Sequence, residues 1–86
     1  MHELSVALEI CRIAEERLGP RQTARLLAVG VEIGDQAGVQ PENLGFCLDA
    51  LLGVPPFGGA RADIIRLPGD VLRVTYLEID DDRPSD

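Results

Sequence analysis

The start of the chain brings together groups that can bind a metal ion. His2 is the only histidine in the sequence, and it lies between Met1 and Glu3. Because the imidazole of His2 is large, we expect Met1 to be retained with its free amine. That amine, the imidazole and the backbone nitrogens of His2 and Glu3 lie within a few bonds of one another and can chelate one divalent ion. Square-planar nitrogen sets suit Ni(II) and Cu(II), whereas zinc prefers tetrahedral sites. The alternative is an arbitrary histidine at a frayed terminus.

Length and composition predict one globular domain. The chain has 86 residues, 45% of them apolar, which is close to the size at which a single core is still adequate. No apolar run approaches the roughly 18 residues needed to span a bilayer. Glu3 and Glu9 precede any arginine, the reverse of the charge pattern of a signal peptide. We therefore expect a cytoplasmic protein with no membrane contact.

The charges exclude several classes of function. Fifteen acidic and eight basic residues give a net charge of −7, so we expect no binding to nucleic acid. All basic residues are arginine, which excludes P-loop and Schiff-base lysines. With a single histidine no catalytic triad is convincing, and we expect no enzymatic activity. Four carboxylates that could form a pair on paper are better interpreted as solvated or capping groups: Glu32, Asp35, Glu42 and Asp49.

The two cysteines, Cys11 and Cys47, lie in apolar helical patterns, and there is no C-x-x-C pair. In a cytoplasmic chain such residues are typically small buried thiols. We therefore expect neither a disulfide nor a structural zinc site.

Hydrophobic periodicity predicts five elements. They are a helix over 4–18, a strand over 25–33, a helix from 41 to 53, and strands over 60–67 and 71–80. The first helix ends at Gly19-Pro20, and its apolar stripe includes Leu4 and Leu8. The last two strands are separated by Pro68-Gly69, which predicts an antiparallel hairpin.

The order αβαββ predicts an α+β fold in which two helices pack on one face of a three-stranded sheet. Leu27, Val29, Val31 and Ile33 are expected to face the helices. The opposite face of that strand, with Leu26, Ala28 and Gly30, would be left to solvent or to a partner. We assign residues 1–80 to the domain and 81–86 to an acidic, disordered tail, with an acidic docking arm as the alternative.

Short segments along the chain resemble the HypA/HybF family of hydrogenase nickel-incorporation proteins over residues 1–80. They are Met1-His2-Glu3-Leu4-Ser5, Val31-Glu32-Ile33-Gly34, Ala37-Gly38-Val39, Pro41-Glu42, Phe46, Phe57, Gly59-Ala60 and Leu77-Glu78-Ile79. The opening M-H-E-x-S together with I-G-x-x-(A/S)-G-V-x-P-E makes the resemblance specific, whereas either part alone would be weak.

The resemblance implies the αβαββ nickel-binding domain of that family. It also implies that Met1, His2 and Glu3 bind Ni(II), through the amine and imidazole directly and through the next backbone nitrogens once deprotonated. The Glu3 side chain would steer the ion or meet a partner. The implied function is a nickel metallochaperone for [NiFe] hydrogenase maturation. Its implied partners are a nickel-delivery GTPase and the hydrogenase large subunit, and some relatives also serve urease.

The chain departs from the family pattern at one place. Family members carry a zinc ribbon between the last two strands, where this sequence has Leu67-Pro68-Gly69-Asp70. We expect no structural zinc. The alternative function is a metal-free docking module that uses the open sheet face or an outer helix edge. A homodimer, through an exposed strand edge or a swap about the 54–59 loop, is left open.

Overall fold

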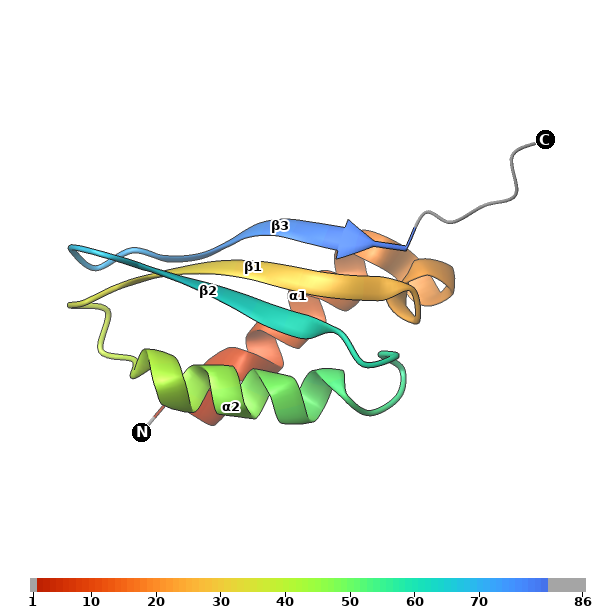
Figure 1. Ribbon diagram of the computed structural model, residues 1–86, viewed down its shortest axis with the longest axis horizontal. Coiled ribbons are helices and arrows are strands. Elements are labelled where there is room, and N and C mark those ends of the chain that lie inside the picture. The colour runs from red at the N-terminus through yellow and green to blue at the C-terminus, as the bar shows by residue number, and fades with distance from the viewer. Residues whose placement is uncertain (1, 81–86) are drawn as a thin grey trace.

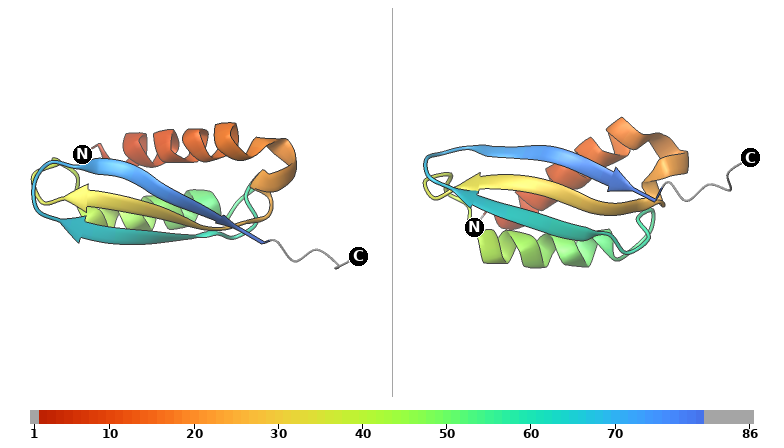
Figure 2. Two further views of the ribbon diagram at one scale, coloured as in Figure 1. Left: turned by 90° about the horizontal axis from the view of Figure 1, so that it is seen from above. Right: turned by 45° about the horizontal axis from the view of Figure 1, so that its top comes forward.

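The fold, seen in a computed structural model that describes residues 2–80, has two helices and a three-stranded sheet (Figure 1). In chain order the elements are α1 (Glu3–Thr23), β1 (Leu26–Gly34), α2 (Pro41–Leu52), β2 (Arg61–Leu67) and β3 (Leu72–Ile79). Both helices lie on the same face of the sheet (Figure 2). The predicted α+β class and element order are confirmed. The predicted tail, 81–86, lies outside the described residues. Over 2–80 no helix is both long and apolar enough to cross a membrane.

β1 is the central strand. The sheet order is β2-β1-β3, with β1 parallel to β2 and antiparallel to β3. The predicted hairpin of the last two strands is therefore wrong, because β1 separates them. β1 is buried on both faces over much of its length, as is typical of a central strand. α2 forms the crossover that a parallel β1–β2 pair requires.

The link between β2 and β3 passes over the end of β1. Three backbone hydrogen bonds fix it, from Gly34 N–H to Val71 O (2.6 Å), from Asp35 N–H to Leu67 O (2.8 Å) and from Gln36 N–H to Gly69 O (2.7 Å). A Cβ atom at position 34 would lie 2.1 Å from the carbonyl oxygen of Gly69. Only glycine therefore lets the link cross so closely.

The core lies between the helices and the inner face of the sheet. Its fully buried side chains include Ala7 and Ala14 of α1, Val29, Val31 and Ile33 of β1, and Leu44, Leu48 and Leu52 of α2. Phe57 is 6% exposed and packs into this core. The predicted stripe of α1 is too wide, because Leu4 and Leu8 are 55% and 52% exposed.

The last turns of α1 and the first residues of β1 each contain an irregularity. Gly19, with φ 77° and ψ 169°, interrupts α1 at the predicted helix end, and the helix then resumes through Thr23. The pairing of β1 with β3 shifts register between Leu26 and Ala28. Leu26 consequently packs in the core while Leu27 is exposed, so the predicted facing of these two residues is wrong.

Side chains from the edge strands cover the outer face of β1. The ring of Tyr76 lies over Gly30, where a Cβ atom would be 2.2 Å from the ring. Its hydroxyl donates a hydrogen bond of 2.5 Å to Asp63 of β2. The pKa of Asp63 is lowered by this bond first and by Arg61 second.

Ala28 is also buried, and its register partners on the two edge strands, Arg61 and Glu78, form an ion pair at 3.5 Å. With Leu26 in the core and Gly30 under Tyr76, the open docking face predicted from Leu26, Ala28 and Gly30 is not present.

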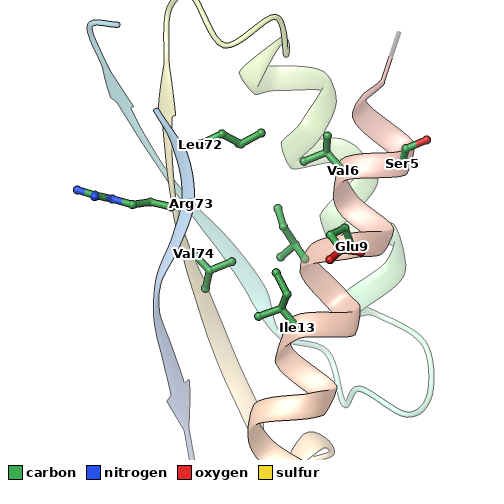
Figure 3. A pocket seen from close by; sticks show the side chains of 8 residues that line it. Ser5, Val6, Glu9, Ile13, Leu72, Arg73 and Val74 are labelled. Carbon is green, nitrogen blue, oxygen red and sulfur yellow. The ribbon is translucent and has the colours of Figure 1, made fainter. Parts of the chain in front are cut away.

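On the inner face, a groove of about 290 Å³ separates α1 from β3. Val6 and Ile13 of α1 point into it from one side, and Leu72 and Val74 of β3 from the other (Figure 3). Arg73 points away from the groove, as strand alternation requires. The groove is bounded on its outer side by the edge strand β3.

Replacing Gly34 by alanine tests the crossing of the β2–β3 link. The added Cβ atom meets backbone rather than a movable side chain, so we expect Gly34→Ala to destabilise the fold by about 2–3 kcal/mol or more. Urea unfolding measures the difference. The matched control is Gly45→Ala in α2, where a Cβ atom would lie 3.8 Å from Ile64. That change should stabilise by about 0.5–1 kcal/mol. Equal effects of the two substitutions would contradict the assigned crossing.

Candidate metal centre at the start of the first helix

His2 is the residue that precedes α1, and its side chain is exposed. Its backbone has φ −107° and ψ 12°, in the sparsely populated region between strand and helix. The carbonyl of His2 accepts a hydrogen bond from Val6 N–H at 2.9 Å. Because the first N–H groups of a helix have no acceptor within it, the backbone nitrogens of His2 and Glu3 make no helical hydrogen bond.

The backbone angle ψ of His2 also sets the relative position of the backbone nitrogens of His2 and Glu3. ψ is the torsion from the residue's own nitrogen to the next, so 12° places both nitrogens on the same side of the Cα–C bond. A five-membered chelate ring through two consecutive backbone nitrogens requires that arrangement. Met1, the remaining residue of the predicted site, lies outside the part of the chain that the structure describes.

Glu3 connects the start of α1 to the start of α2. Its carboxylate accepts a hydrogen bond of 2.9 Å from the backbone N–H of Gln40, 37 positions away. Gln40 in turn precedes α2, and its carbonyl accepts Leu44 N–H at 2.9 Å. The bond from Gln40, followed by one from its own N–H, lowers the pKa of Glu3. Sequence reasoning missed Gln40, because a backbone donor leaves no mark in residue type.

Three of the four carboxylates considered for a catalytic pair are held in separate contacts. Glu32 pairs with Arg73 at 2.7 Å, Asp35 accepts Gly69 N–H at 3.0 Å, and Glu42 pairs with Arg66 at 3.4 Å. Within residues 2–80 no group of three or more histidine, cysteine, aspartate or glutamate side chains could hold a metal ion. A site of one imidazole and main-chain nitrogens is of a different kind.

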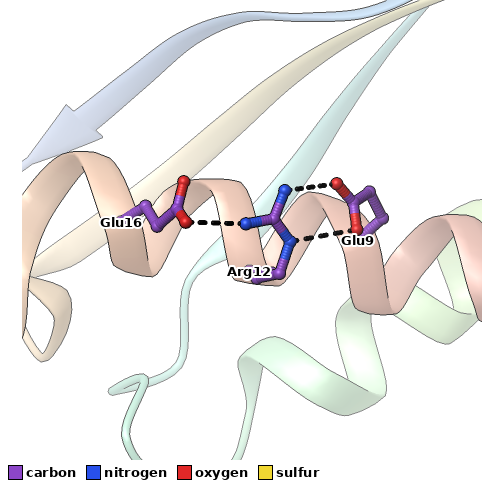
Figure 4. Close-up of polar contacts among 3 residues, drawn as sticks. All are labelled: Glu9, Arg12 and Glu16. Atoms are coloured by element: carbon purple, nitrogen blue, oxygen red, sulfur yellow. Dashed lines mark hydrogen bonds and ion pairs between the residues drawn. The ribbon is translucent and has the colours of Figure 1, made fainter.

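The charged face of α1 carries its own network. Arg12 lies between Glu9 and Glu16 and forms ion pairs with both (Figure 4). Arg12 lowers the pKa of Glu9, and Glu9 foremost, with Glu16, raises the pKa of Arg12. All three side chains are more than half exposed, so the network adds little to stability.

Both cysteines are free thiols. Cys11 is buried, as predicted, and burial, with a smaller contribution from Glu15, raises its pKa to about 11. A protonated thiol is a poor metal ligand and nucleophile. Cys47 is only partly buried, so the prediction of a buried thiol is wrong for this residue.

Comparison with known proteins gives consistent matches. The family described as "Hydrogenase/urease nickel incorporation, metallochaperone, hypA" matches residues 1–72. A "Hydrogenase maturation factor HypA" of Azotobacter chroococcum mcd 1 is 41% identical over 69 residues, which are 80% of this chain and 61% of that protein. Proteins of the same name from Geobacter metallireducens and Deinococcus radiodurans are 42% and 38% identical over the same length. The chain spans about three fifths of the length of these relatives.

Glu3→Gln tests the connection between the two helix starts. A carboxylate whose pKa is lowered by folding stabilises the fold above its unfolded pKa, and this contribution is lost as pH falls through the folded pKa. We therefore expect Glu3→Gln to be less stable than the parent at neutral pH. The difference should shrink once the pH is below the ordinary glutamate value of 4.5.

Urea unfolding across that pH range measures the effect. The control is Glu15→Gln, which removes an exposed carboxylate of the same helix. A stability difference for Glu3→Gln that does not depend on pH would contradict the role assigned to this carboxylate.

Proposed function

The chain belongs to the HypA family, and from this premise we propose that it is a nickel carrier that binds Ni(II) at Met1, His2 and Glu3. The ligands are the α-amino group of Met1, the imidazole of His2 and the deprotonated backbone nitrogens of His2 and Glu3. The observation that carries the proposal is the conformation of His2, whose ψ of 12° places the backbone nitrogens of His2 and Glu3 on the same side of its Cα–C bond.

Binding at these nitrogens is compatible with the folded state. The first hydrogen bond of α1 runs from Val6 to His2, so coordination by the nitrogens of residues 2 and 3 breaks no bond of the helix. The carboxylate of Glu3 is already engaged with Gln40, which supports a positioning role for this side chain and a ligand role for its backbone nitrogen only. Nickel can thus enter and leave while the core stays intact.

The proposed ligands carry protons that the metal must displace. An amine, an imidazole and two amides all lose protons on coordination, so affinity should fall as pH falls. Intrinsic affinity does not favour nickel over copper, because copper stands higher in the divalent series. Selectivity in the cell then rests on metal availability and on the partner that receives the ion.

We further propose that the carrier acts in the cytoplasm, and that it delivers nickel for hydrogenase maturation together with a nickel-delivery GTPase and the hydrogenase large subunit. No reaction is assigned to it. Where the family pattern has a zinc ribbon, this chain has a short link between β2 and β3 that crosses directly over Gly34. The nickel site, at the start of α1, does not include this link.

His2→Ala tests the proposal. The exposed side chain of His2 contributes nothing to the core, so the variant should fold normally and lose nickel. We expect a loss of affinity greater than the roughly 10–100-fold that follows removal of a metal site's outer-shell partner. Calorimetric titration of untagged protein with Ni(II), with absorbance at the square-planar d–d band, measures it.

Two comparisons make this result specific. A chain with an uncleaved N-terminal extension should also bind weakly, since its α-amine is displaced. Asp35→Asn, which changes an acidic residue held by Gly69, should bind like the parent. Stoichiometric nickel retained by His2→Ala would rule out the assigned site.

A further inference from the structure

The free edge of β3 has a symmetric arrangement of backbone groups. Among residues 2–80 this strand has β1 on one side only. Val71 and Asp80, which flank it, both bond toward β1, to Gly34 and Arg25. Hydrogen-bonding direction alternates along a strand, and the register shift next to Thr75 absorbs one residue. The backbone groups that point to the free side are therefore those of residues 72, 74, 77 and 79.

Side chains of β3 repeat the same symmetry about the midpoint between Thr75 and Tyr76. Antiparallel pairing of two copies about this midpoint places Arg73 opposite Glu78 on the outer face, twice. It places apolar pairs on the inner face, Leu72 with Ile79 and Val74 with Leu77. Arg73 and Glu78 are 65% and 52% exposed, so both are accessible from the free side. Opposite charges and apolar pairs facing across two strands stabilise their pairing.

Space for the second copy lies beneath this edge. The groove between α1 and β3 lies next to a second hollow of about 260 Å³, and Ile13 and Val74 line both. The apolar inner-face side chains of an added strand project to the side on which this groove lies (Figure 3). The groove would accept them.

We propose that β3 pairs in antiparallel fashion with β3 of a second copy of this chain, forming a six-stranded sheet across a two-fold axis. The other edge strand lacks this complementarity. Two copies of β2 in full antiparallel overlap would place Asp63 opposite Ile65 and Arg66 opposite Ala62, with no charge pair. The β3 interface is isologous and uses no residue of the nickel site.

Charge reversal with mixing tests the pairing. In Arg73→Glu two glutamates face each other at both contacts, and in Glu78→Arg two arginines do, so each variant alone should have a dimer dissociation constant raised about tenfold or more. An equimolar mixture restores opposite charges at both contacts and should form heterodimers near the parent's affinity. Sedimentation equilibrium from micromolar to millimolar protein, with chelator present to exclude metal-bridged dimers, measures all four samples.

The mixture also serves as the control for folding. Arg73 pairs with Glu32 and Glu78 with Arg61 inside the chain, and the variants lose these contacts. Mixing does not restore them, so recovered dimer reports the interface alone. A monomeric parent at every concentration, variants that dimerise like the parent, or a mixture no better than its components would each overturn the proposal.

Amide hydrogen exchange of the parent gives a second, independent readout. Protection of residues 72, 74, 77 and 79 should rise with protein concentration, while that of residues 73 and 78 should not change. Protection of residues 72, 74, 77 and 79 that does not depend on protein concentration would also overturn the proposal. That outcome would include a free edge that binds a strand of another protein instead of a second copy of this chain.

Discussion

The close passage of the β2–β3 link over Gly34 is the constraint on which the arrangement of the domain depends. It keeps β2 and β3 on opposite sides of β1, and it uses the backbone of residues 34–36 as donors to the link. The loop that follows leads to Gln40 and α2. Gln40 then donates to Glu3. The crossing and the start of α1 are thus joined through one short, hydrogen-bonded segment.

The residue types of β1 follow from its central position. Its inner face is filled by Val29, Val31 and Ile33, which the helices cover. Its outer face has the small residues Ala28 and Gly30, because long side chains of the edge strands meet above them. Most charged groups on the sheet are paired in this covering. The nitrogens at the start of α1 lie outside this covering.

The sequence predicted the elements and their order well, because hydrophobic periodicity and the Gly19-Pro20 helix end are local signals. It did not predict the strand order. Pro68-Gly69 indicates a chain reversal between β2 and β3. Two strands joined by a reversal need not be neighbours in the sheet, because a third strand can lie between them. The nearly continuous apolar run at the start of β1, residues 26–31, was the sequence signal for a central strand.

For the site, the types and order of residues 1–3 pointed to nitrogen ligands. The contact of Glu3 with Gln40 depends on a backbone donor 37 positions away, which no residue type reveals.

Nickel binding at the start of α1 is tested most directly by an NMR titration of the isotopically labelled chain with Ni(II), which follows every backbone amide. We expect changes that saturate at one equivalent and are confined to the start of α1 and the neighbourhood of Gln40. Amides of β1, β2 and β3 should stay where they are. Changes centred on the carboxylates of the sheet, on Cys47, or spread over the whole domain would contradict nickel binding at the start of α1.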